Sequence, residues 1–464
     1  MSQPIEAVVT GVGPVSAIGS GRNDYWTALL EGRSGFGPIT LCDVSTSPSK
    51  IGAEVRDFRL RDYVANGELL ERRTPRPVQL ALASAVLALH DAEIDLDACD
   101  PDRMGVQVGT SIGNLGDLLT LNRKLTETGA VPAHTAFHAF HHSAACVVSS
   151  FFNIRGPIHT TSSGCNSGID GLGQSVRMIQ AGAVDAMLVI GTDCELVPEV
   201  LAALNASGSL TTRYNDDPTR ASRPFDRDRD GNVIGEGAAA VLLEAAPHAQ
   251  RRRARAYAKV AGYRIASAGQ NRQYSHDRPE LDLRPAVRAM KGAIDEAGWR
   301  AVDVVNANGS SSVIYDRAEA LALAEVLGPK LEKTPVHSIK SMLGQHGAGS
   351  SMLQVVTSCL TLRRGTIPPT TNHENPDPAC GPIRVLTEPL PSWPTRALVH
   401  SIGLGGFYYS AAALEAVEDE AAMQTGMVQV RWSEQHHPRF QPAEEFQRPL
   451  VPWNPRRDPD NQLP

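Results

Sequence analysis

The chain lacks the cysteine and charge patterns that would hold a metal, a disulfide framework or a nucleic acid. Its seven cysteines are odd in number and widely spread, and no CxxC pair occurs (positions 42, 99, 146, 165, 194, 359 and 380). This pattern is typical of reduced thiols and argues against disulfides and cysteine-based zinc sites. The net charge of -7 excludes a general basic surface for nucleic acid.

Long apolar runs are also missing. No stretch of 18 apolar residues and no signal peptide occurs, so we expect a soluble, cytoplasmic protein without membrane contact. The glycines at 171–173 and 403–406 do not form a GxGxxG fingerprint after a strand. We therefore expect no dinucleotide cofactor.

Two stretches could be mistaken for metal sites. Residues 226–231 begin like an EF-hand loop, but the acidic Glu236 falls one place too early to close it. Four histidines lie close together without partner carboxylates, beside loop-forming Pro132 (His134, His138, His141 and His142). We therefore expect no metal.

What the chain does contain is an alternation of strands and helices. We predict helices at 77–92, 284–297 and 316–327, and strands at 105–110, 302–307 and 396–402. The length would allow about three domains of ~150 residues, yet nothing between residues 6 and 417 resembles a linker. This pattern predicts an α/β fold with a buried parallel sheet, and no internal repeat is visible in it.

Cys165 is the strongest candidate for chemistry. It lies in the run TTSSGCNSG at 160–168, and the apolar residues that follow it have helical spacing (Ile169, Leu172, Val176 and Ile179). A thiol at the start of a helix is a candidate nucleophile, because the free backbone N–H groups favour the thiolate and lower its pKa. The alternative is an inert buried thiol.

Several further segments resemble the β-ketoacyl-ACP synthase family, the condensing enzymes of the thiolase fold. In order along the chain they are VVTGVGPVSAIG at 8–19, RPFD at 223–226, GEGA at 235–238 with VLLE at 241–244, KSM at 340–342, and GLGG at 403–406. Together they extend the resemblance from about residue 6 to residue 417.

The resemblance implies an αβαβα layered fold of two similar halves, a ketosynthase N-terminal half at 1–250 and a C-terminal half at 251–417. Residues 418–464 lie outside the family pattern, and their aromatic residues and prolines favour an extended strap over a disordered tail. Family members form dimers, so we expect a homodimer, or a heterodimer with a ketosynthase subunit, with its interface near 156–163.

The resemblance also assigns roles to individual residues. Cys165 matches the cysteine that takes an acyl group, as a thioester, from an acyl carrier protein. The backbone N–H groups of Cys165 and Leu404 match the oxyanion hole. Residues after Leu404 would shape the substrate pocket (Gly405, Gly406, Phe407 and Tyr408), and the aromatic residues at 407–409 replace the usual small polar ones.

Both histidine positions of the family differ in this chain. They carry Asn308, in NANGS at 306–310, and Gln345, in KSMLGQ at 340–345, with the typical 37-residue separation. Lys340 is retained, but Gln354 stands where an acidic residue normally pairs with it. Amides can donate hydrogen bonds but cannot act as general bases. A local shift could bring the imidazole of the adjacent His346 into the site.

Three hypotheses remain open, all in fatty-acid or polyketide biosynthesis. The first is an acyltransferase in which Cys165 passes its acyl group to an amine, a hydroxyl or an already acidic carbon, without efficient malonyl decarboxylation. The second is a decarboxylative carbon–carbon condensing enzyme with an unusual site. The third is a non-catalytic partner like the chain-length factors, which usually lack the cysteine.

Overall fold

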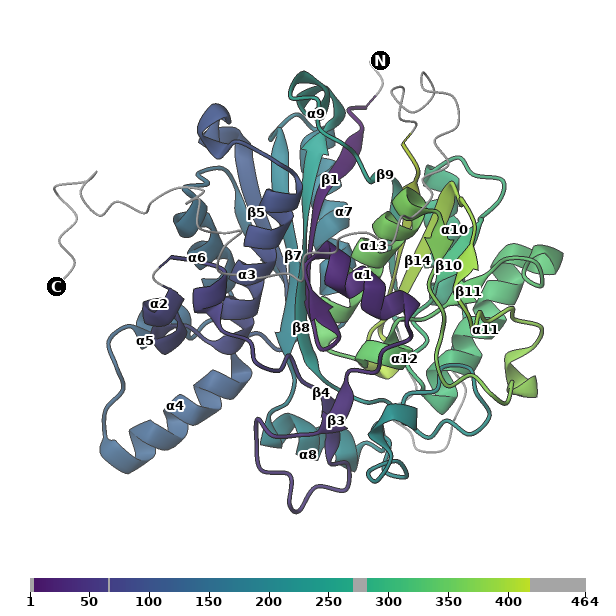
Figure 1. Ribbon diagram of the computed structural model, residues 1–464, viewed down its shortest axis with the longest axis horizontal. Helices are drawn as coiled ribbons and strands as arrows, with labels where there is room; N and C mark the ends of the chain where they lie inside the picture. Colours follow the sequence, from purple (N-terminus) through teal and green to yellow (C-terminus); the bar gives the residue numbers. More distant parts are fainter. Residues whose placement is uncertain (1–3, 66, 270–281, 418–464) are drawn as a thin grey trace, which may run out of the picture.

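The computed structural model describes residues 4–65, 67–269 and 282–417; the predicted C-terminal strap at 418–464 lies outside them. An eleven-stranded sheet runs through this part of the chain, in the order β11-β10-β14-β15-β9-β1-β8-β7-β5-β6, with β2 paired to β1. The sheet consists of two sets of five strands that meet at β1 and β9 (Figure 1).

The two sets repeat one topology. The first contains β1 (Ala7–Ser16), β5 (Met104–Gly109), β6 (Ile158–Thr161), β7 (Ala186–Cys194) and β8 (Glu236–Ala245). The second contains β9 (Ala258–Ser267), β10 (Val304–Asn306), β11 (Val336–His337), β14 (Arg396–Ile402) and β15 (Tyr408–Glu415). In both, the third strand along the chain lies at the outer edge, followed by the second, fourth, fifth and first.

Strand direction repeats as well. The second strand of each set pairs in parallel with the third and the fourth. The fourth and fifth strands, and the fifth and first, pair antiparallel. In the described part of the sheet, the two sets pair where Val8 lies opposite Lys259 and Val9 opposite Ala258. The structure thus confirms the two similar halves that the sequence pattern did not reveal.

Helices form three layers around the two sets of strands (Figure 1). α3 (Arg76–Asp91) and α6 (Ser143–Phe152) pack on the outer face of the first set. α10 (Arg284–Glu296) and α11 (Val313–Leu327) cover the second set. Between the sets lie α7 (Ser167–Gln180) and α13 (Gly347–Arg364), which share one core with strands of both. The predicted αβαβα layering is therefore confirmed.

α13 is enclosed along most of its length. Every residue from Gly347 to Leu362 is buried, including a stripe of polar residues (Ser350, Gln354, Thr357, Ser358 and Thr361). α12 (Lys340–Leu343) is buried and carries Lys340. The other elements flank or connect the layers: α1 (Arg22–Leu30), β2 (Gly19–Ser20), β3 (Phe36–Pro38), β4 (Ile51–Ala53), α2 (Gly67–Arg73), α4 (Leu115–Thr128), α5 (Thr135–His138), α8 (Pro198–Ala206), α9 (Ala246–Arg251), β12 (Thr366–Ile367) and β13 (Leu390–Pro391).

Element boundaries agree closely with the sequence patterns except near the predicted site. The strand at 396–402 matches β14, and the helix at 77–92 is α3 at 76–91. The strand predicted at 302–307 is shorter in the structure, where β10 covers 304–306. It ends there because the backbone N–H groups of Asn308 and Gly309 donate to the Glu319 carboxylate of α11 and not to a neighbouring strand. α11 begins at 313, three residues earlier than predicted, because the Ser312 side chain caps it.

Within the described ranges, no helix has the length and apolarity needed to cross a bilayer. The same residues contain no cluster of three or more potential metal-binding side chains.

Candidate active site

Loops at one end of the central strands bring residues of both halves together. Cys165 lies between β6 and α7, one residue before the helix N-cap Asn166. The preceding Gly164 has a φ of 67°, a left-handed conformation that favours glycine. The Cys165 side chain is buried, with 6% of the residue exposed. As predicted from the apolar spacing, Cys165 immediately precedes an amphipathic helix.

Two hydrogen-bond donors from the C-terminal half lie at the Cys165 thiol. These are the backbone N–H of Leu404 and the side-chain amide of Gln345, and both favour the thiolate. Burial and the nearby Glu195 carboxyl have the opposite and larger effect, and they raise the thiol pKa to about 11. The lowered pKa expected from the helix start is therefore wrong, because the thiol is enclosed and lies beside an acid.

Asn308 is held in one orientation. Its Oδ1 accepts hydrogen bonds from the Ile402 backbone N–H at 3.1 Å and from Lys340 Nζ at 3.2 Å. The opposite end of the amide, Nδ2, has no hydrogen-bond partner among the described residues. Asn308 can therefore present a donor, while its acceptor is already engaged.

Lys340 connects Asn308 with Gln354. Its Nζ donates to the Asn308 backbone oxygen at 2.8 Å and to Gln354 Oε1 at 3.1 Å, in addition to Asn308 Oδ1. Burial lowers the Lys340 pKa to about 8, although the Glu319 carboxylate and the Cys165 thiol act in the opposite direction. Gln354 fixes its own amide by donating to the Ala307 and His400 backbone oxygens.

Glu319 and His400 support the site from behind, and the sequence analysis missed both. Glu319 accepts hydrogen bonds from the backbone N–H groups of Asn308 at 2.7 Å and Gly309 at 2.8 Å. The same carboxylate contacts His400 Nδ1 at 2.7 Å. Both side chains are fully buried. The sequence offered one signal for Glu319: it is an acidic residue on the helix predicted at 316–327, eleven positions after Asn308.

Asp193 and Glu195, at the end of β7, were also missed. The Asp193 carboxylate accepts hydrogen bonds from the backbone N–H groups of Ser111, Ile112 and Ala348, and so joins both halves. Glu195 is buried, and no hydrogen-bond donor reaches its carboxyl from the described residues. Two acids directly after an apolar strand could have been recognised as candidates.

His346 lies next to Gln345 in the sequence, but its ring points elsewhere. A Cβ built on Gly237 would lie 2.8 Å from His346 Nε2, and one on Gly349 would lie 2.7 Å from Cδ2, so the ring packs between these two glycines. Burial, and then the charge of Lys340, lower its pKa to about 3. The structure thus brings together Cys165, Gln345 and Leu404, and Lys340 with Asn308, but places the His346 ring against β8.

The remaining predicted pocket residues form the turn into β15. Gly405, with a φ of 81°, donates its N–H to the Tyr315 hydroxyl at 2.7 Å, and Gly406 donates to the Gly403 backbone oxygen at 2.9 Å. The Phe407 ring packs on Gly405. Tyr408 is 44% exposed and begins β15. Their substrate contacts stay a prediction.

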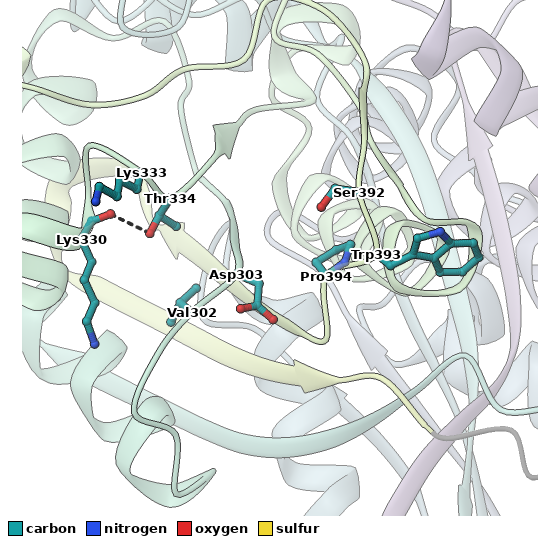
Figure 2. Close-up of a pocket in the computed structure, with 8 residues that line it drawn as sticks. All are labelled: Val302, Asp303, Lys330, Lys333, Thr334, Ser392, Trp393 and Pro394. Carbon is teal, nitrogen blue, oxygen red and sulfur yellow. Dashed lines mark hydrogen bonds between the residues drawn. The ribbon is translucent and has the colours of Figure 1, made fainter. Parts of the chain in front are cut away.

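A surface groove of about 420 Å³ lies at the other end of the same strands (Figure 2). It is lined by Val302, Asp303, Lys330, Lys333, Thr334, Ser392, Trp393 and Pro394. Asp303 precedes β10, whereas Asn308 follows it. None of the predicted site residues lines this groove, so it is separate from the Cys165 site.

Family profiles match most of the chain. The profile described as beta-ketoacyl synthase, N-terminal domain, matches residues 6–249, and the corresponding C-terminal domain matches residues 257–374. The 3-oxoacyl-[acyl-carrier-protein] synthase 2 of Coxiella burnetii is 35% identical over 409 residues, which cover 86% of this chain and 96% of that protein. The tetracenomycin polyketide synthase ketoacyl synthase alpha subunit of Streptomyces glaucescens is 34% identical over 421 residues, 88% of this chain and 96% of that protein.

Solved structures agree with these matches. A type II polyketide synthase ketosynthase, in complex with its acyl-carrier protein and bound to the hexaketide, superposes with a TM-score of 0.81 at 27% identity, covering 90% of this chain and all of that chain. The ishigamide ketosynthase/chain length factor gives a TM-score of 0.80 at 27% identity, covering 89% of this chain and all of that one.

The layered fold and the paired halves agree with these matches. The chain belongs to the β-ketoacyl synthase family.

Proposed function

We propose that this chain is a ketosynthase-family acyltransferase of polyketide or fatty-acid-type biosynthesis. In this proposal Cys165 takes an acyl group from an acyl carrier protein as a thioester and transfers it to a second substrate, without efficient decarboxylation of a malonyl extender. The observation that carries the proposal is the Cys165 thiol, placed between two hydrogen-bond donors, in a site whose two proton-transfer positions are amides.

Loading requires few groups besides the thiol. Cys165 Sγ attacks the thioester carbonyl of the donor, the bond to the carrier thiol breaks, and the thiol proton passes to the departing sulfur. The Leu404 backbone N–H, already directed at Cys165, is suited to the oxyanion of the tetrahedral intermediate. Backbone donors do not depend on the side chain, so this group is available whatever side chain stands at 404.

Decarboxylative condensation requires more. The carboxylate of a malonyl donor must leave as carbon dioxide while the enolate is stabilised and protons are moved. Asn308 Nδ2 and the Gln345 amide can donate to an enolate oxygen, but neither exchanges a proton near neutral pH. Loss of each proton-transfer group costs about 10²–10⁴ in rate. His346, with its ring between Gly237 and Gly349, does not compensate in this arrangement.

The chain-length-factor alternative receives support from the ishigamide ketosynthase/chain length factor, one of the similar solved structures. The retained Cys165 counts against it. Self-acylation of Cys165 separates the two functions, because a purely structural subunit would take no acyl group.

Partners follow from the same proposal. The acyl donor is an acyl carrier protein, and the chain pairs with a second copy or a ketosynthase subunit through β6. Among the described residues no strand pairs with the outer edge of β6, and Ile158 is 42% exposed. The equivalent edge strand β11 is covered by its own chain, because Val336 exchanges hydrogen bonds with Arg384 and Leu386. An open strand edge is a pairing surface.

Intact-mass spectrometry tests the proposal. The wild-type protein and a Cys165→Ala variant are incubated with a panel of acyl-carrier-protein thioesters, with and without malonyl-carrier protein. We expect an adduct that needs Cys165 and that malonyl donors do not discharge. Release of a β-ketoacyl product would establish the condensing alternative, and absence of any adduct would favour the partner subunit.

A further inference from the structure

The groove at the start of β10 has one wall that holds an exposed tryptophan (Figure 2). The Ser392 N–H donates to the Gly365 oxygen at 3.0 Å, and a Cβ built on Gly365 would lie 2.4 Å from the Trp393 ring. The backbone therefore fixes this wall. Trp393 is nevertheless 75% exposed, the highest value among the large apolar residues of the described ranges. An exposed tryptophan in a preformed groove is typical of an interaction surface.

Two lysines of this groove lack a counterion. Lys330 Nζ donates to the Arg300 backbone oxygen at 2.9 Å, which is a neutral acceptor. No partner of the Lys333 ammonium occurs among the described residues. Of the lining residues only Asp303 is an acid, and it accepts from the Thr395 N–H at 2.9 Å and from the Thr395 hydroxyl at 2.8 Å. The groove therefore offers positive charge as well as an apolar ring.

The C-terminal end of the described chain lies beside the same groove. The Ala416 N–H donates to the Thr395 oxygen at 2.8 Å, and Thr395 directly follows Pro394 of the tryptophan wall. Thr395 also contacts Asp303, which lines the groove. Val417 is 38% exposed, and the residues from 418 onwards lie outside the described part of the chain. The segment that follows Val417 therefore starts next to the groove.

The charge of this segment complements the charge of the groove. Its first three residues, at 418–420, are all acids. Because an extended chain advances about 3.3 Å per residue, they lie within about 10 Å of Val417. A further cation lies where the segment begins: Arg396 is 4.0 Å from the Glu415 carboxylate, and its Nε has no hydrogen-bond partner among the described residues. Acids at 418–420 thus follow directly on cations that lack full partners.

We propose that residues 418–420 turn into this groove and pair with Lys330 and Lys333. The apolar residues that follow them, at 421–423, then cover the Trp393 ring. Exposed ion pairs are weak one by one, but the covalent tether at Val417 keeps the acids at a high local concentration. The occupant of the groove is therefore this chain's own C-terminal segment, and neither a second copy nor another protein.

Docking at this place leaves the candidate active site open. The groove begins at Asp303, before β10, whereas Asn308 follows the strand at its other end. A segment bound in the groove therefore does not cover the loops that carry Cys165. This docking also does not depend on the proposed acyl transfer, so it can be tested on protein that carries no acyl group.

Carbodiimide cross-linking of the full chain tests the ion pairs. The reagent joins a carboxylate to a neighbouring ammonium as an amide, and the lost oxygen leaves in the urea by-product. We expect peptide mass spectrometry to find residues 418–420 linked to Lys330 or Lys333. Lys291 on α10, an exposed lysine beside Glu325, is the control and should form no link to 418–420.

A mixture of unlabelled and isotope-labelled protein identifies the source of the segment. We expect every link between 418–420 and the groove lysines to join residues of one chain. Links of mixed isotope composition would show that a second copy fills the groove, and links from 418–420 to other lysines would place the segment elsewhere. Either result would overturn the inference.

Oxidation of Trp393 by N-bromosuccinimide, followed in its peptide by mass spectrometry, tests the covered ring. We expect reversal of the three acids to lysine (Glu418→Lys, Asp419→Lys and Glu420→Lys) to speed this oxidation about tenfold, because the segment is repelled. Glu127→Lys, at an exposed acid on α4, is the control and should leave the rate unchanged.

A charge swap separates specific pairing from a general disturbance of the fold. Lys330→Glu with Lys333→Glu should expose Trp393 to the same degree as reversal of the acids. Combination of both reversals restores opposite charges, and we expect it to restore protection of the ring. An unchanged oxidation rate in either reversal, or no recovery in the combination, would overturn the inference.

Discussion

The two halves of this protein share one strand order but contribute different chemistry. After β6 the N-terminal half supplies the thiol of Cys165, and at the equivalent place after β11 the C-terminal half supplies the amide of Gln345. After β7 lies the carboxyl of Glu195, and after the matching β14 lies the backbone N–H of Leu404. One half thus provides a nucleophile and an acid, and the other provides hydrogen-bond donors.

The comparison shows how a repeated scaffold can separate acylation from elongation. The thiol and the backbone donor sit in loops that the fold itself positions. In the proposed function, proton transfer depends on the two positions that match the family's histidines, 308 and 345, and both carry amides here. Replacement at two positions can therefore remove one step and leave the other in place.

Removal of the thiol should have the largest effect. We expect Cys165→Ala to abolish the acyl adduct completely, because no other group occupies the position between the Leu404 N–H and the Gln345 amide. Cys146→Ala, at an exposed cysteine, serves as the control and should load like the wild type. Intact-mass spectrometry measures the acyl adduct in each variant. An adduct that persists in Cys165→Ala would show that another residue carries the acyl group.

Restoring titratable groups in the C-terminal half should have the next largest effect. We expect the double variant Asn308→His with Gln345→His to raise malonyl decarboxylation by about 10²–10⁴, as measured by release of labelled carbon dioxide. The control exchanges the two amides, Asn308→Gln with Gln345→Asn, and should give no gain. No gain from the histidine pair would mean that the pocket as well as the two side chains excludes elongation.

Two buried acids that hold the site loops, Glu319 and Asp193, should stabilise the folded protein. We expect Glu319→Gln and Asp193→Asn each to lower the free energy of unfolding by about 3 kcal/mol, because each leaves buried backbone N–H groups with a weaker acceptor. Urea unfolding measures the change. The exposed Glu325→Gln on α11 should leave it within about 0.5 kcal/mol. Equal midpoints in all three variants would contradict this role.

The two edge strands should differ in association. We expect Ile158→Asp, on the open edge of β6, to weaken dimer formation by about tenfold, since a charge enters an apolar contact. Ile265 is equally exposed at 42% but lies in the central strand β9, so Ile265→Asp should leave association unchanged. Sedimentation at several protein concentrations measures the strength of the dimer. A dimer of unchanged strength in Ile158→Asp would mean that β6 is not part of the interface.

The smallest expected effect is a shift in the pKa of the Cys165 thiol when Gln345 is replaced. With a pKa of about 11, the rate of Cys165 alkylation by iodoacetamide should rise about tenfold per pH unit up to that value. The Gln345 amide stabilises the thiolate, so Gln345→Leu should move the midpoint to higher pH. Gln250→Leu, in α9 and remote from the thiol, is the control. A midpoint that falls in Gln345→Leu would contradict the hydrogen bond.

Local sequence determined much of the fold. Apolar spacing located α3, α7, α10 and β14 to within a residue or two, because periodicity reports which face of an element is buried. Short motifs predicted a site at Cys165, Asn308 and Gln345, and the structure brings Gln345 to the Cys165 thiol.

Only the tertiary structure decided how these residues act. The charge of Glu195, 30 residues further along the chain, and burial by distant elements raise the thiol pKa that the helix start alone would lower. The repeat of the two halves was likewise invisible in the sequence, because one strand order can be built from different residues. Packing and electrostatic fields depend on three-dimensional neighbours, and the linear pattern does not contain them.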